Sequence, residues 1–526
     1  MPAFWYADMT EKQQLFRNIV LTFLAQLLLL LRGLLVMPII VKMAGVDVFG
    51  AYVILGSFIT FVYAVSALGT NYTYRRQLPS TNSLSQRRAL MMPQLAFRLI
   101  TVLGLCIAFL MADQQLSSLL HLSEDQFDFR LGCLWLLGLL VNEQVTDYYR
   151  YVDRIGAFNL VTIVPLFAFI GAVIVVALLK VPITLNLLAL LQASALLLIN
   201  APIFFLDILG RTGIEWPRTN WNIFFNNAKT GFPLIWGFIS DFLLNVGDRY
   251  LILLFLSMSA VGEYQTAYQL AALLAFFPQI ISVVLPTQMS RLWDQGNRIE
   301  AEYLVKLCLH MFLMIAIPFV VGALLTGPSV LALLANAKCA TAARWVVPLV
   351  ASGMVFYGVV LLFQQIGFVT GHNARIQGVN AIALIANFGL NATILPFLPD
   401  ITVAGATTLV AYLLAATMSI RVMLPVWRIP VDWGRLMRYV VATGIMAALL
   451  LVLGYRPGLV QEVSVLRLVC DVVGAMTSYF VGLMLVGGFS RKDLGLLVNL
   501  IRKRKFVESS SEISENQHLQ GHARPQ

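Results

Sequence analysis

Apolar stretches about as long as a bilayer is thick recur along the whole chain, separated by charged or turn-forming residues. An α-helix needs about 20 residues to cross the hydrocarbon core of a membrane, so each stretch predicts one spanning helix. The predicted helices cover residues 16–42, 48–69, 90–112, 129–149, 157–179, 183–209, 231–256, 260–286, 303–326, 345–369, 376–397, 402–424, 436–454 and 464–487. The pattern predicts an all-α, polytopic membrane protein with about fourteen transmembrane helices.

The predicted helices form two groups of six, followed by a final pair. We expect an N-terminal lobe at 1–212, a C-terminal lobe at 230–428 and two further helices within 429–488. The linker between the lobes, 213–229, carries tryptophan and phenylalanine among polar residues, which is typical of an amphipathic segment on the cytoplasmic membrane surface. The last part, 489–526, is basic and then polar, which predicts a cytoplasmic tail with a disordered end.

Composition and charge agree with this class of protein. Of the residues, 59% are hydrophobic and 12% are charged, against about 25% charged residues in soluble domains. Most arginines and lysines fall in connections on one side of the predicted membrane, and basic loops stay in the cytoplasm. We therefore expect a multi-pass membrane protein with both termini cytoplasmic. The net charge of +10 follows from these loops and does not indicate binding to nucleic acid.

The sequence offers little material for catalysis. The 5 cysteines and 5 histidines show no spacing typical of a disulfide framework or a zinc site. There is no GxxxxGK[ST] loop for ATP, and no large external segment that could hold the paired carboxylates of a membrane glycosyltransferase or polymerase. The sequence therefore favours a transporter over an enzyme. We expect no cofactor or metal, and leave coupling to protons or sodium ions open.

The two halves of the chain contain a similar short pattern. Phe49-Gly50-Ala51-Tyr52 opens the second predicted helix, and Val261-Gly262-Glu263-Tyr264 opens the eighth, 212 residues later. Each follows a long apolar helix across a very short connection. Repeats of this kind are one plan of transporter architecture, with the substrate site between the halves. The pattern indicates two pseudo-symmetric lobes that arose by duplication.

An ordered set of short motifs resembles the polysaccharide-biosynthesis flippases, which belong to the multidrug/oligosaccharidyl-lipid/polysaccharide exporter superfamily. The motifs in the second half are Phe232-Pro233-Leu234, Asp248-Arg249-Tyr250, Val261-Gly262-Glu263-Tyr264 with Tyr268, Leu285-Pro286 and Ser290-Arg291-Leu292. The stretch from Gly45 to Tyr52, with Tyr74-Arg75, resembles the second helix of the same family. The resemblance covers about residues 15–425. Glu263 departs from the family pattern, which usually has an uncharged residue there.

This resemblance implies a two-lobed, V-shaped carrier that moves undecaprenyl-diphosphate-linked oligosaccharides to the outer leaflet by alternating access. It implies membrane lipids and the lipid-linked glycan as partners, together with polymerase and assembly proteins of polysaccharide or exopolysaccharide biosynthesis. The final pair of helices also occurs in the lipid II flippase branch, so that branch stays open. Two further hypotheses are a multidrug/cation antiporter of the same superfamily and a non-transporting scaffold of an assembly complex.

Charged and polar residues inside apolar helices are the first candidates for a site, because their insertion into the membrane is costly. Arg32 lies near the middle of the first helix, with Gln26 one and a half turns earlier, and an arginine fork suits a diphosphate. Asp241, Asn245 and Asp248 share one face of the seventh helix. We predict that Arg32, Gln26, Asp241 and Asn245 bind substrate, with Asp241 also a candidate ion site or partner of Arg32.

Asp248, Arg249 and Glu263 are predicted to form a gate or an ion-coupling site near the external end of the second lobe. Aromatic and amide side chains suit the faces and hydroxyl groups of sugars, although ordinary helix packing uses them too. Four such residues are predicted to contact the sugars: Tyr52, Tyr63, Tyr268 and Gln269.

Three further charged residues are interpreted without a function. We expect Arg98 to snorkel from the third helix to the cytoplasmic interface. Glu143 and Asp147 are expected to be solvated or to pair with Arg150 at the end of the fourth helix.

Overall fold

The computed structural model describes residues 11–78, 83–123, 126–152, 154–210, 221–427 and 432–488, and within these ranges it contains helices and no strand. The first half comprises α1 (Glu11–Ala44), α2 (Val46–Val65), α3 (Thr70–Gln77), α4 (Leu84–Met111), α5 (Asp113–Leu119), α6 (Phe129–Tyr151), α7 (Ile155–Leu178), α8 (Leu185–Pro202) and η3 (Ile203–Leu209). The second half comprises α10 (Trp221–Phe255), α11 (Met258–Ala272), η4 (Leu273–Ala275), α12 (Phe276–Asp294), α13 (Arg298–Leu334), α14 (Ala337–Ala342), α15 (Val346–Val369), α16 (Asn373–Ile394) and α17 (Ile401–Met423). The chain continues through α18 (Trp433–Val452) and α19 (Val465–Leu485).

Every range that the hydrophobic pattern predicted as a helix is occupied by one, which confirms the all-α membrane fold. Among the described residues, ten helices are long and apolar enough to cross a membrane. The others are interrupted or carry several charges, as α6 and α10 do. The total of fourteen spans remains a prediction.

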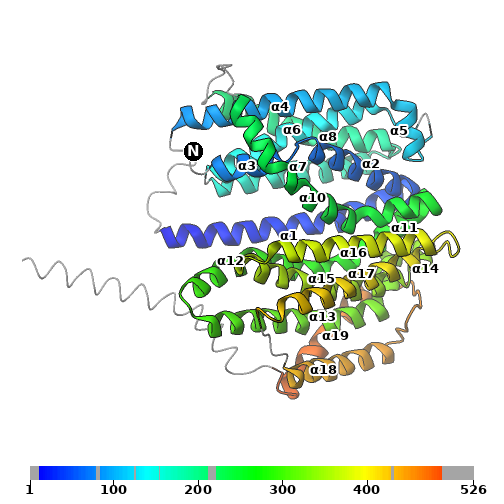
Figure 1. Cartoon of the computed structure of the whole chain (residues 1–526). Coiled ribbons are helices and arrows are strands. Elements are labelled where there is room, and N and C mark those ends of the chain that lie inside the picture. Colours follow the sequence, from blue (N-terminus) through cyan, green and yellow to red (C-terminus); the bar gives the residue numbers. More distant parts are fainter. Residues whose placement is uncertain are drawn as a thin grey trace, which may run out of the picture.

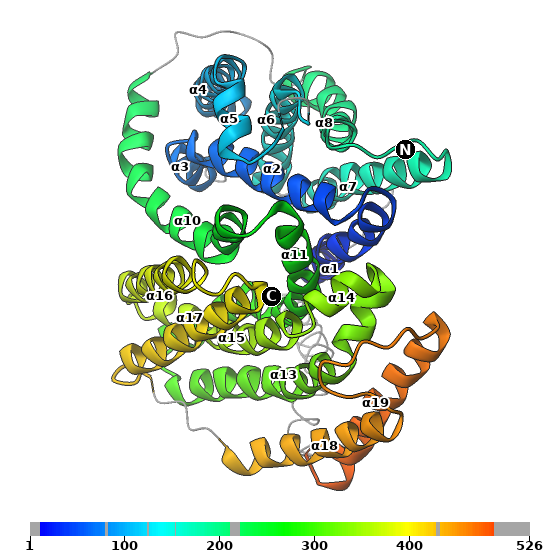
Figure 2. The ribbon, with the colours of Figure 1, turned by 90° about the vertical axis from the view of Figure 1, so that its right-hand side faces the viewer.

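The helices lie side by side in two bundles, which are stacked one above the other in Figures 1 and 2. The first lobe contains α1 to α8, and the second contains α11 to α17. Helices α18 and α19 pack against each other and against α13, on the side of the second lobe away from the first (Figure 2). The short helices α5 and α14 lie at one end of the molecule, which is the end that the charge pattern assigns to the outside (Figure 1).

Helix α10 joins the lobes by crossing from one to the other (Figure 1). Near its start, Asn227 exchanges side-chain hydrogen bonds with Gln77 of α3, at 2.9 and 3.3 Å. Near its end it packs on α16 and α11 of the second lobe. Residues 221–229 are thus the first turns of this long helix and do not form a separate surface segment as predicted. Residues 211–220 and the tail, 489–526, lie outside the described part of the chain.

The two lobes meet where the sequence repeat lies, at the start of α2 and of α11. A Cβ atom added at Gly50 would overlap the carbonyl oxygen of Met258, and one added at Gly262 would overlap that of Val46. Residues 50 and 262, and residues 46 and 258, are each 212 positions apart. Such a reciprocal contact is what a two-fold axis produces, so the geometry supports the inferred duplication.

Candidate functional site

The first lobe contains a cavity of about 430 Å³, with most of its lining from α1, α2, α6, α7 and α8, and Phe242 of α10 at its edge. Its polar lining consists of Arg32, Tyr52, Ser57, Thr60, Asn142, Thr162 and Gln192. No carboxylate lines it among the residues that the structure describes. A polar cavity in an otherwise apolar bundle is a site that a membrane transporter can use for its cargo.

Arg32 is the cation of this cavity. Its Nη2 atom donates a hydrogen bond of 2.8 Å to Oε1 of Gln192, and its Cζ atom lies 5.7 Å from the ring centroid of Phe169. Tyr52 donates its hydroxyl to the same Gln192 oxygen at 3.2 Å. Within the described residues Arg32 forms no ion pair, so its partners leave the positive charge uncompensated. A half-buried, unneutralised guanidinium facing a cavity is suited to an anion.

Aromatic rings form part of the cavity wall beside this charge. Tyr52 stacks on Trp135 at a centroid distance of 5.9 Å and on Phe169 at 6.0 Å. Gly56 makes room for the indole, since a Cβ atom there would lie 3.1 Å from Cη2 of Trp135. Of the four residues predicted to contact the sugars, Tyr52 lines this cavity.

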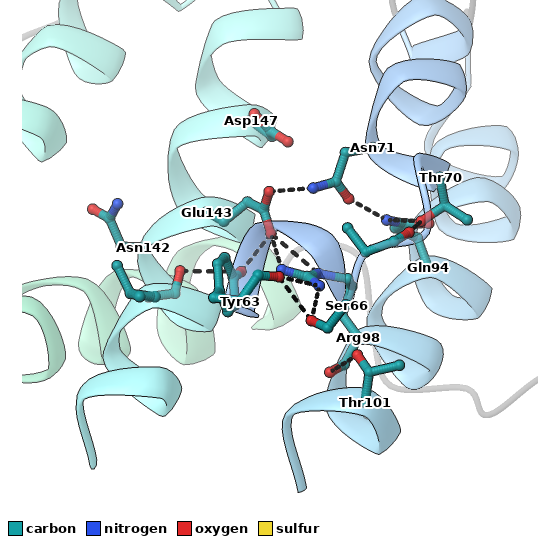
Figure 3. A network of polar contacts seen from close by, with 12 residues as sticks. Tyr63, Ser66, Thr70, Asn71, Gln94, Arg98, Thr101, Asn142, Glu143 and Asp147 are labelled. Atoms are coloured by element: carbon teal, nitrogen blue, oxygen red, sulfur yellow. Dashed lines mark hydrogen bonds and ion pairs between the residues drawn. The ribbon is translucent and has the colours of Figure 1, made fainter. Parts of the chain in front are cut away.

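Tyr63, another residue predicted to contact the sugars, lies away from this cavity. It is buried in a polar network, where its hydroxyl donates to Glu143 (Figure 3). The guanidinium of Arg98 lies 4.1 Å from the centroid of its ring. Because these groups occupy the ring and hydroxyl, Tyr63 does not face the cavity, and the prediction of a sugar contact finds no support here.

The network around Tyr63 corrects the interpretation of Arg98. This arginine does not reach the interface, because its side chain is fully buried and forms an ion pair of 3.0 Å with Glu143. It also donates a 2.9 Å hydrogen bond to Ser66 (Figure 3). A buried charge needs a partner, and α6 supplies one.

Glu143 and Asp147 are likewise not solvated, so the first of the two alternatives predicted for them is wrong. Arg75 of α3 bonds both carboxylates, at 3.2 Å to Glu143 and 2.9 Å to Asp147. Two arginines, Arg75 and Arg98, thus face two carboxylates where α3, α4 and α6 meet. The charges balance within the network, whereas that of Arg32 does not.

The predicted gate in the second lobe is an internal ion pair. Arg249 lies 2.7 Å from Asp248, both side chains are buried, and Tyr264 donates its hydroxyl to Asp248. Arg249 also donates a 2.6 Å hydrogen bond to Gln265 and covers the ring of Tyr268 at 4.1 Å. The pair therefore lies between α10 and α11 and not between the lobes. Tyr268 is buried beneath the guanidinium of Arg249, so the prediction of a sugar contact finds no support here.

The remaining candidates are dispersed. Asp241 is exposed on α10, where Asn245 donates a 2.8 Å hydrogen bond to its carbonyl oxygen, and it does not pair with Arg32. Glu263 is half-buried near the start of α11. Gln269 packs against Gly33 of α1, with its Oε1 atom buried and without a hydrogen-bond partner in the described chain. The side chain of Gln26 lies outside the described part of the structure.

Gln192, which holds Arg32, is not among the site residues predicted from the sequence. It lies in the middle of the apolar range 183–209, and an amide at that depth is itself a signal for a polar partner. The pairing of Gln192 with Arg32 could not be predicted from the sequence, because 160 residues separate the two along the chain.

A second cavity of about 430 Å³ lies between α13 and the pair α18–α19. Almost all of its lining is apolar, from Pro318 and Phe319 on α13 to Met476 and Phe480 on α19. Gly322 of α13 borders free space in this cavity, since a Cβ atom there would meet nothing within 4 Å.

The fold is similar to those of solved membrane transporters. The lipid II flippase MurJ in an inward closed conformation aligns with 89% of this chain and 98% of its own, at 13% identity and a TM-score of 0.71. A multidrug resistance MATE family transporter of the MOP superfamily, in an inward-facing conformation, covers 80% of this chain and 98% of its own, at 14% identity and a TM-score of 0.58. At these identities the likeness shows a shared fold.

No sequence among the curated proteins compared matches the chain. A family profile does: the one described as "Polysaccharide biosynthesis protein" matches residues 15–293, more than half of the chain. This match covers the first lobe, α10 and the repeat at the start of α11, including the Gly50–Gly262 contact and Arg32. An all-helical membrane transporter fold and this profile agree, and the chain belongs to the polysaccharide biosynthesis protein family.

Proposed function

We propose that this protein is a secondary transporter that flips an undecaprenyl-diphosphate-linked oligosaccharide from the cytoplasmic to the outer leaflet, for polysaccharide export. The family and the flippase-like and transporter-like fold support movement of a substrate across the membrane. The observation that carries the substrate class is the uncompensated charge of Arg32 in the cavity of the first lobe.

A diphosphate is the costliest part of such a lipid to move, because it loses its hydration in a region of low dielectric constant. A guanidinium offsets part of this cost with two parallel hydrogen bonds to phosphate oxygens. Arg32 uses one donor atom for Gln192 and is close to no described carboxylate, so it has donors to spare. Nearby, Tyr52 and Trp135 line the cavity with aromatic rings, and Thr60 and Asn142 offer hydrogen-bonding groups for the first sugars.

The apolar cavity beside α18 and α19 suits the other end of the same molecule. Its wall offers no charge to a hydrocarbon chain, and the polyprenyl tail gains free energy from every methylene that it buries. Alternating access between the two lobes would move the polar head across, driven by protons or sodium ions. We place the protein in a bacterial inner membrane with both termini cytoplasmic, beside the polymerase and assembly proteins that use its product.

The test replaces Arg32 in cells that make a surface polysaccharide. Arg32→Ala should abolish glycan display and raise the amount of lipid-linked precursor, while Arg32→Lys keeps the charge, loses the fork and should retain part of the activity. Arg130→Ala, which removes an exposed arginine from the same lobe, is the matched control.

Glycan and precursor are measured together at equal amounts of each protein in the membrane. Normal display by Arg32→Ala would make Arg32 a structural charge and remove the basis of the proposal. Unchanged display together with lost export of lipophilic cations would favour the multidrug antiporter.

A further inference from the structure

Gln192 of α8 is the direct partner of Arg32. Its Oε1 atom accepts a hydrogen bond of 2.8 Å from Arg32 and one of 3.2 Å from Tyr52, so it connects α1, α2 and α8 at the cavity wall. Only 7% of the residue is exposed, which fixes the amide where it meets the guanidinium. The three side chains therefore present Arg32 to the cavity in one orientation.

The chemistry of this partner matters as much as its position. An amide oxygen accepts from the guanidinium without a negative charge, so it orients Arg32 and leaves the full positive charge for a ligand. A glutamate has almost the same shape and would offer a carboxylate at the same place. It would pair with Arg32 and neutralise it, because no other carboxylate lines the cavity among the described residues.

We propose that Gln192 is a specificity-determining residue, whose neutral side chain keeps the first-lobe cavity cationic and thereby selects a ligand with a diphosphate group. The inference rests on the proposed function, since it takes Arg32 as the group that meets the diphosphate. It adds that residue 192 sets the net charge of the site, so that one neutral amide decides whether the cavity attracts an anionic ligand.

The experiment measures binding to the full-length protein purified in detergent, with farnesyl diphosphate and farnesyl monophosphate as probes. The variants are Gln192→Glu, Gln192→Leu and Arg32→Ala. Gln279→Glu places the same new charge on the exposed face of α12 and serves as the control. Thermal unfolding confirms that each variant is folded.

Gln192→Glu should weaken binding of the diphosphate by about tenfold or more, the value of one lost charge-assisted interaction of about 1.4 kcal/mol. Its preference for the diphosphate over the monophosphate should fall towards none. Gln192→Leu keeps the cavity cationic, so it should lose only about two- to threefold in affinity, for the orienting bond, and keep its preference for the diphosphate. Gln279→Glu should behave as the wild type does.

The outcomes separate the two proposals. If Arg32→Ala weakens binding but Gln192→Glu does not, the role of Gln192 is refuted and the proposed function stands. A loss in Gln192→Leu equal to that in Gln192→Glu, with the preference unchanged, would also refute it, because the geometry alone would then matter. If Arg32→Ala binds the diphosphate as the wild type does, the proposed function itself is refuted.

Discussion

Arg32 and Arg98 are both arginines within apolar helices of the first lobe, and their neighbours give them different roles. Arg98 is fully buried and its charge is balanced by Glu143. Arg32 is half-buried at a cavity and bonds only neutral groups in the described chain. The sequence alone suggested that Arg32 has a function and that Arg98 snorkels. The structure shows instead that Arg98 is part of an internal polar network that connects α2, α3, α4 and α6.

Removing the carboxylate of this network should destabilise the protein. In Glu143→Gln, Arg98 would lose its ion pair while it stays fully buried, and breaking a buried pair in this way costs about 3–5 kcal/mol. We expect a clearly lower unfolding temperature in detergent, and Glu462→Gln, at an exposed position, should show no change. Replacing both partners, in Arg98→Leu with Glu143→Leu, should destabilise less than the sum of the single changes. An unfolding temperature of Glu143→Gln equal to that of the wild type would show that the pair contributes nothing.

At the scale of elements, the final pair of helices completes a cavity that neither lobe forms by itself. Helix α13 contributes one wall, including Pro318, Phe319 and Gly322, and α18 and α19 contribute the other, including Met446 and Phe480. The hydrophobic pattern predicted both helices but not what lies between them and the second lobe. Helix α10 gives a second example, since its first turns look like a surface linker in the sequence and pack on α3 in the structure.

Filling the apolar cavity should impair transport without unfolding the protein. Gly322→Leu has room for its side chain, since nothing lies within 4 Å of a Cβ atom there. Each displaced methylene of a bound tail costs about 0.8 kcal/mol, so displacing two would weaken binding about tenfold. Flipping should be measured in proteoliposomes with a polyprenyl-diphosphate-linked sugar. Gly171→Leu, at an equally open position on α7 of the first lobe, is the control, and equal rates for both variants would show that the tail does not use this cavity.

At the scale of the whole molecule, the lobes touch through backbone at the end assigned to the outside. Gly50 and Gly262 let α2 and α11 approach so closely that no side chain fits between them. In the alternating-access mechanism that we propose, this contact has to separate when the carrier opens outward and the substrate leaves between the lobes. Glycine allows a reversible contact here, because the two helices touch through their backbones and no side chains interlock between them.

A side chain at either glycine should therefore hold the carrier open to the outside. Gly50→Leu and Gly262→Leu should each almost abolish transport and raise the rate at which an impermeant maleimide, added outside, labels a cysteine placed at Thr60 in the cavity. The pseudo-two-fold axis predicts similar effects for the two changes. Gly104→Leu, where a new side chain meets nothing within 4 Å, should leave both readouts unchanged. Inactive Gly50→Leu protein with unchanged labelling would contradict this role of the contact.

By itself, the sequence determined the helices, the membrane setting, the repeat and the presence of a charge in the first helix. These follow from local rules, because a segment in lipid must satisfy its backbone internally and its length and apolar character decide whether it can span. Only the tertiary structure decided which polar groups meet. Gln192, which is uncharged, orients Arg32 from 160 residues away along the chain. The rings of Tyr63 and Tyr268 are each covered by the guanidinium of an arginine. Such pairings depend on how helices pack and rotate against each other, and the packing of small and apolar residues that sets this leaves no periodic pattern in the chain.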